Sequence, residues 1–136
     1  MIGMFLAERA SALQDWLSPL DLAGGHLECD GLSRSISTLL HRERIEHQLL
    51  VGSFHSDAHG VLSPHYWVRF SDGLICDFRV RSWLGDLEDL PHGVFQCPST
   101  VRYEAVVQDV GRLGAAVFEI LVGRKLESFP NFKETR

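Results

Sequence analysis

The sequence predicts an α+β fold in which helices pack on an antiparallel sheet, and two features of the chain support this class. Apolar residues recur at helical spacing in two stretches before residue 45 and in one stretch after residue 109. Between them, short runs suited to strands are separated by turn-forming residues. Because the helices and the strands are segregated along the chain, an antiparallel sheet is expected. The 136 residues are expected to form a single domain, residues 1–136.

Two helices are expected in the first third of the chain. Leu6, Leu13 and Leu17 are part of an apolar stripe over residues 2–17, and the Ser18-Pro19 pair is expected to end this helix. A glycine-containing loop follows, and a second helix is expected from about residue 31 to residue 42. Its inward stripe comprises Leu32, Ile36, Leu39 and Leu40.

The middle of the chain predicts strands, and a last helix follows them. Residues 55–64 are rich in turn formers and are expected to form a loop, and the stretch 82–99 is expected to be irregular. A final helix is expected over about 110–123, with Asp109 as its N-cap and a loosely held tail after it. The expected strands comprise residues 45–54, 65–70, 74–80 and 102–108, and the last of these could instead lead into the final helix.

The stretch HYWVRFSDGLICDF reads as a β-hairpin whose register follows from hydrophobicity. A three-residue loop with Gly73 in a left-handed conformation would pair Val68 with Cys76. One face would then carry an entirely core-like set: Tyr66, Val68, Phe70, Leu74, Cys76 and Phe78. A shift by one residue would exchange the two faces, so this register is the expected one.

In this register, His65 and Asp77 share the other face of the hairpin and lie diagonally across from each other. Their backbones would be about 7–8 Å apart, which lets the two side chains form a hydrogen bond. Such a pair also occurs as an ordinary polar contact, and Arg69 or Arg79 could neutralise Asp77 instead. The pair is therefore a candidate base and orienting acid, or a simple ion pair.

Cys29 is expected at the start of the second helix, where it could complete a catalytic triad. Unpaired backbone N–H groups and the positive end of the helix dipole favour the thiolate form of a cysteine. The same N–H groups can stabilise an oxyanion. An imidazole beside the thiol can act as base, and a carboxylate can orient that imidazole. Cys29, His65 and Asp77 are the predicted catalytic residues; a small buried cysteine is the alternative interpretation.

The stretches ECDGLSRSISTLL, HYWV and DGLICDF together resemble the transglutaminase-like cysteine enzymes of the broad papain-like group, over about residues 26–83. The resemblance implies a papain/transglutaminase-like core with Cys29 as nucleophile, His65 as base and Asp77 as orienting acid. It also matches Trp67 to an aromatic residue that borders the substrate, while Gln14 and His26 are both candidates for the oxyanion donor. The arylamine N-acetyltransferases show a similar order, and the cell-wall peptidases with a DCSG motif are a close alternative.

Cysteine-dependent acyl chemistry through a thioester is therefore expected: amide hydrolysis, deamidation or acyl transfer on a protein or peptide substrate. The alternatives are a cell-wall-peptidase-like amidase and a non-catalytic binding module with the same fold. The net charge of −5 argues against binding nucleic acid or an anionic membrane. No cofactor or metal is expected, because the histidines and the three cysteines lack the spacing of a zinc site. The cysteine count suggests a cytoplasmic location, or export without a recognisable signal peptide.

Overall fold

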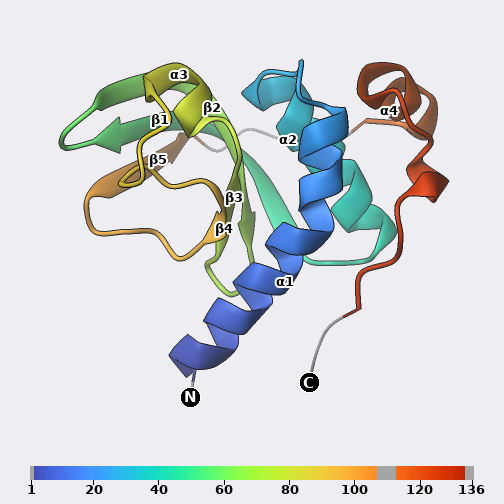
Figure 1. The fold of residues 1–136 in the computed structure, drawn as a ribbon, viewed down its shortest axis with the longest axis horizontal. Helices are drawn as coiled ribbons and strands as arrows, with labels where there is room; N and C mark the ends of the chain where they lie inside the picture. Colours follow the sequence, from blue (N-terminus) through green and yellow to red (C-terminus); the bar gives the residue numbers. More distant parts are fainter. Residues whose placement is uncertain (1, 107–112, 134–136) are drawn as a thin grey trace.

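The computed structural model describes residues 2–106 and 113–133 and shows an α+β fold (Figure 1). Five strands form one antiparallel sheet in the order β4-β3-β2-β1-β5. The helices are α1 (Ile2–Ala23), α2 (Cys29–Arg42), α3 (Val80–Leu84) and α4 (Ala115–Val122), with a short 3-10 helix η1 (Leu126–Ser128). The strands are β1 (His47–Ser56), β2 (Gly60–Phe70), β3 (Ile75–Asp77), β4 (Gly93–Phe95) and β5 (Val101–Val106).

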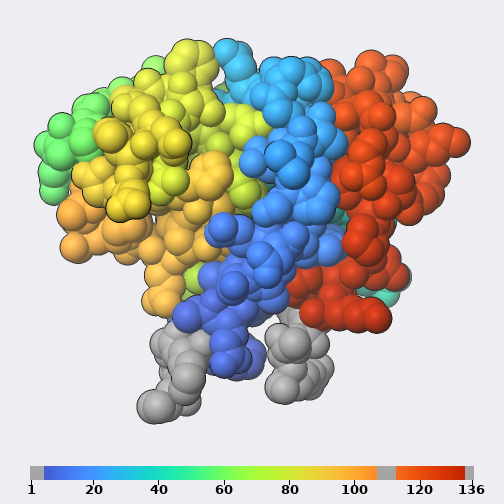
Figure 2. Space-filling model, viewed as in Figure 1, coloured from blue at the N-terminus to red at the C-terminus, as the bar shows by residue number. Residues whose placement is uncertain are grey.

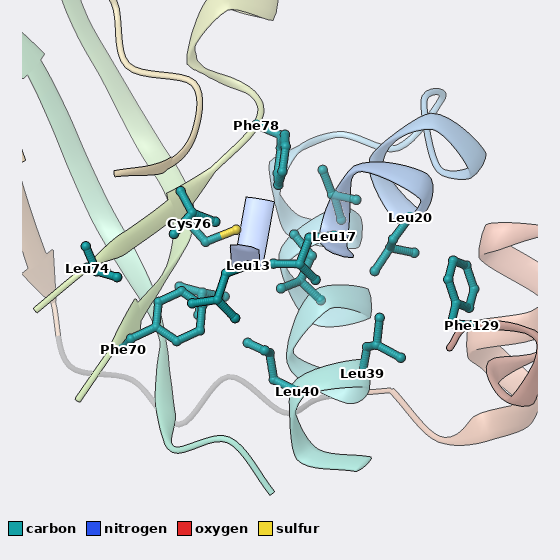
Figure 3. Packing of buried hydrophobic residues seen from close by; sticks show 14 of the residues in the cluster. Leu13, Leu17, Leu20, Leu39, Leu40, Phe70, Leu74, Cys76, Phe78 and Phe129 are labelled. Carbon is teal, nitrogen blue, oxygen red and sulfur yellow. The ribbon is translucent and has the colours of Figure 1, made fainter. Parts of the chain in front are cut away.

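One face of the sheet packs against α1 and α2 and forms the main hydrophobic core (Figure 3). The apolar stripes of the two helices meet the predicted core face of the hairpin, and Phe129 joins them from the C-terminal segment. The space-filling view shows this C-terminal segment lying along α1 (Figure 2). The hairpin contributes Val68, Phe70, Leu74, Cys76 and Phe78 to this core.

The hairpin has the predicted register. Val68 pairs with Cys76, and the Phe70 N–H donates to the Leu74 carbonyl at 2.8 Å across the three-residue loop. Gly73 has a φ of 91°, a left-handed conformation that glycine adopts without steric cost. Tyr66, which was expected to face the core, is only half-buried and lines a pocket.

Much of the opposite face of the sheet is also buried. Trp67 is 1% exposed and packs with Leu50 and Ile75 in a second apolar cluster. Tyr103 of edge strand β5 lies 4.9 Å from the Trp67 ring and 6.4 Å from Phe95 on the other edge strand, β4. The sheet is therefore curled strongly enough to bring side chains of its two edges together over its concave face.

The first helix continues past the predicted stop at Ser18-Pro19 and ends at Ala23. Proline inside a helix removes one backbone hydrogen bond and costs about 3 kcal/mol. Leu17 and Leu20 lie on either side of Pro19 and are fully buried, and burying such a side chain stabilises by about 1.5–3 kcal/mol each. Tertiary packing thus outweighs the local signal at Pro19.

Three further expectations are wrong. Residues 93–95, within the stretch that was expected to be irregular, form β4. Most of residues 55–64 belongs to the long hairpin of β1 and β2, which turns at residues 57–59. The tail is held up to Phe132, because Arg42 donates to the carbonyls of Leu126, Phe129 and Pro130 at 2.8–2.9 Å. The last helix begins at Ala115, and the predicted N-cap Asp109 lies outside the described residues.

Over the described part of the chain, no helix combines the length and apolarity that a membrane span needs.

Candidate active site

Cys29 is the first residue of α2, two positions before the predicted helix start. The preceding residue, Glu28, has extended backbone (φ −79°, ψ 179°), and its side chain makes no capping hydrogen bond. The Leu32 N–H donates to the Glu28 carbonyl at 3.0 Å, so the intrahelical bonds begin after the first turn. The N–H groups of that first turn therefore point out of the helix end around the Cys29 side chain, where they are available to a ligand.

His65 and Asp77 form the predicted pair on neighbouring strands. Nε2 of His65 lies 2.6 Å from Oδ2 of Asp77, and both side chains are 1% exposed. Burial alone would lower the pKa of the His65 ring, but the hydrogen bonds and charges of Asp77 and Cys29 outweigh it and raise the pKa to about 9. His65 is therefore an imidazolium at neutral pH.

Two further groups hold the Asp77 carboxylate. The Tyr103 hydroxyl donates to Oδ2 at 2.9 Å, and the Arg79 backbone N–H donates to Oδ1 at 3.0 Å. Burial and the nearby Asp77 charge raise the pKa of Tyr103 far above its usual range, so it remains a neutral donor. With His65, the carboxylate accepts from three directions, which fixes its orientation.

Cys29 and His65 meet at an open pocket of about 480 Å³. The Cys29 side chain is a hydrogen-bonding and charge partner of His65, and both effects raise the pKa of the imidazole. Because Nε2 of His65 is directed at Asp77, Nδ1 is the ring nitrogen left for the thiol. The pocket lies between the start of α2, the hairpin residues 61–66 and Trp83 of α3.

Arg79 connects the acid to the loop that carries the cysteine. Its backbone N–H binds Asp77, whereas its guanidinium donates to the Asp21 carboxylate and to the carbonyls of Gly24 and Leu27. The side chain is almost fully buried. Arg79 is therefore a positioning residue that ties the segment before Cys29 to the end of β3, rather than a neutralising partner of Asp77.

The three predicted substrate-contact residues lie away from the pocket. Trp67 is buried and stacks behind His65, with ring centroids 6.2 Å apart, so it supports the imidazole and presents no surface to a substrate. His26 contacts the Leu121 carbonyl with its Nε2 at 2.8 Å. The side-chain oxygen of Gln14 accepts the Val94 N–H at 2.9 Å and joins α1 to β4. The helix-start N–H groups are thus the oxyanion donors nearest to Cys29.

Sequence reasoning missed Tyr103 as a partner of Asp77, and it missed Trp83, Glu28 and Asp30 as pocket residues. The signal for Glu28 and Asp30 was present, because they flank the proposed nucleophile. Tyr103 and Trp83 reach the site through the curl of the sheet and the short helix after β3, which no local pattern reveals. Among the described residues, no group of three or more His, Cys, Asp or Glu side chains is arranged to hold a metal ion.

Comparisons with protein-family models, with curated proteins and with solved structures find no match for this chain. The geometry of the pocket is therefore the basis for assigning a function.

Proposed function

We propose that this protein is a cysteine-dependent amide hydrolase that acts through Cys29, His65 and Asp77 on a peptide or protein substrate. The observation that carries the proposal is the buried His65–Asp77 pair, which holds an imidazolium against a thiol at the start of a helix. A buried ion pair alone could be structural. A thiol in an open pocket on the other side of the imidazole is the feature that favours catalysis.

The chemistry follows from the positions of the donors and acceptors. The imidazolium of His65 favours the thiolate of Cys29, which attacks the carbonyl carbon of an amide. The resulting oxyanion would lie at the N–H groups of the first turn of α2. Collapse of this intermediate breaks the carbon–nitrogen bond, and the His65 proton passes to the leaving amine. The product is a thioester on Cys29, with His65 neutral.

Release of the thioester restores the site. Neutral His65 removes a proton from water, the hydroxide adds to the thioester carbonyl, and a carboxylic acid leaves from Cys29. An amine in place of water would give acyl transfer, and a side-chain amide as substrate would give deamidation. Of these outcomes, we favour hydrolysis. Throughout, Asp77 and Tyr103 keep the imidazole in one orientation.

A transglutaminase-like or papain-like relationship is part of this proposal. It is supported by the order of Cys29 at a helix start, His65 on β2 and Asp77 on β3, the neighbouring antiparallel strand. A reducing compartment such as the cytoplasm also belongs to the proposal, because the nucleophile must remain a free thiol, as all three cysteines are here.

Trapping of the acyl intermediate tests the proposal without knowledge of the natural substrate. The protein is mixed with p-nitrophenyl acetate, quenched in acid and analysed by peptide mass spectrometry. We expect acetyl on Cys29, and we expect its loss in Cys29→Ala but not in the matched control Cys97→Ala. Acetylation of Cys97 at an equal rate, or none on Cys29, would contradict the proposal. A folded protein with an inert Cys29 would support the non-catalytic binding module instead.

A further inference from the structure

We propose that the pocket selects substrates with a positive charge beside the reacting carbonyl, such as peptides with a lysine or arginine next to the scissile amide. This inference rests on the proposed function, because it assigns a substrate class to the same pocket. It is carried by the charges on the helix side of the pocket and by the apolar residues opposite them.

The helix side of the pocket is acidic. Glu28 and Asp30 flank Cys29 in sequence, and both line the pocket. Of the described residues that line it, none is lysine or arginine. Arg34 pairs with Asp30 from the next turn of α2, but Asp30 remains half exposed toward solvent. Even when Arg34 is counted against Asp30, the Glu28 carboxylate leaves this side of the pocket with a net negative charge.

The opposite side is apolar and open. Val61 of the hairpin and Trp83 of α3 are each 56% exposed, and both line the pocket. Lysine and arginine side chains bury their aliphatic stems on apolar surface while their charged ends reach water or a carboxylate. An indole face also attracts a cation directly. Apolar walls facing two carboxylates therefore match a basic side chain better than an acidic or a purely apolar one.

Charged thiol reagents measure this selectivity independently of turnover. Methanethiosulfonates that carry a trimethylammonium, a neutral methyl or a sulfonate group deliver the same reactive sulfur to Cys29. We expect the ratio of the cationic to the anionic rate to be higher at Cys29 than at Cys97 of the same molecule. Glu28→Gln and Asp30→Asn should each lower this ratio by about two- to fivefold, the effect of one partly screened charge a few ångströms away.

Glu127→Gln is the matched control. Glu127 is exposed on η1 and does not line the pocket, so this substitution makes the same change in net charge away from Cys29. Glu28→Gln loses no capping bond, so its fold should be unaffected. If Cys29 reacts but the ratio of its cationic to its anionic rate is unchanged in both Glu28→Gln and Asp30→Asn, the charge selectivity is refuted and the proposed function stands. A Cys29 inert to all three reagents would overturn the proposed function itself.

A peptide series then separates charge selection in substrates from selection of small reagents. Peptides that differ only in lysine, glutamine or glutamate beside the amide should give kcat/KM in that order for the wild type. The differences should shrink about two- to fivefold in Glu28→Gln. Equal kcat/KM for the lysine and glutamate peptides would refute the inference.

Discussion

Replacing Asp77 by asparagine should remove a pH-dependent part of the stability of the fold. Asp77 accepts from His65 and Tyr103 at Oδ2 and from the Arg79 N–H at Oδ1. In either orientation, the asparagine NH₂ group faces at least one of these donors. A buried donor left without a partner costs about 1–3 kcal/mol, and the His65 charge also loses its counter-ion. Since the His65 and Asp77 side chains are both buried, water cannot replace the lost partners.

The pH window follows from the raised pKa of His65. The native ring holds its proton up to about pH 9, whereas the unfolded ring releases it near 6.5. The stabilisation is therefore fully present below pH 6.5 and is lost as the pH rises through 9. At about 1.4 kcal/mol for each pH unit, the titration of His65 alone would lower the free energy of unfolding by about 3 kcal/mol across this window. This is an upper limit for the wild type, because a Cys29 thiolate in the folded protein, which the proposed mechanism requires, has the opposite pH dependence.

Urea unfolding followed by tryptophan fluorescence at several pH values measures this dependence. Wild type should lose stability between pH 6.5 and 9, and Asp77→Asn should be less stable at pH 6.5 with most of the slope gone. Asp89→Asn is the matched control, because Asp89 pairs with His59 at 2.7 Å on the surface, and its profile should follow wild type. Equal slopes in wild type and Asp77→Asn would refute this reading of the buried pair.

Three other substitutions test the support around the site. Tyr103→Phe removes only the hydroxyl that binds Asp77. It should slow acylation of Cys29 about three- to tenfold and lower the free energy of unfolding by about 1 kcal/mol. Unchanged acylation would mean that Tyr103 only packs against its neighbours and does not support the site. Lysine at position 79 cannot reproduce the bonds from Arg79 to Asp21, Gly24 and Leu27. Arg79→Lys should therefore lower the free energy of unfolding in urea by about 2–4 kcal/mol and slow the labelling of Cys29. The control Arg69→Lys should change neither quantity. Gly93→Ala should cost more stability than Gly73→Ala. Both glycines have positive φ, but only at Gly93 would the new Cβ lie 2.1 Å from Oε1 of Gln14, so the Gln14 side chain must move and give up its bond to the Val94 N–H; equal losses would mean that this bond contributes nothing to stability.

The hairpin and the three candidate catalytic residues could be located from sequence because each depends on local rules. The alternation of apolar residues around Ser71-Asp72-Gly73 excludes the shifted register, and this register brings His65 and Asp77 to the same face. The start of α2 also follows from local pattern, to within two residues. These predictions needed no knowledge of how distant segments pack.

The parts that sequence reasoning missed depend on tertiary structure. Tyr103 reaches Asp77 only because the sheet curls and brings β5 over its concave face, and the two residues are 26 positions apart. The same curl buries Trp67, which the resemblance placed beside the substrate. Pro19 remains helical because Leu17 and Leu20 are buried on either side of it. Packing between distant segments thus places Tyr103 against Asp77 and determines where α1 ends.

The central claim, that Cys29 is an activated nucleophile, is tested most directly by the rates at which the three cysteines react with iodoacetamide at pH 7. Burial raises the pKa of both Cys76 and Cys97, which keeps them as thiols, whereas Cys29 lies beside His65 and at the start of a helix, two features that promote attack by a cysteine. Partial labelling followed by peptide mass spectrometry should show Cys29 modified at least about tenfold faster than Cys97, and this advantage should be lost in His65→Ala. A folded protein in which Cys97 reacts first and Cys29 stays unmodified would contradict the account.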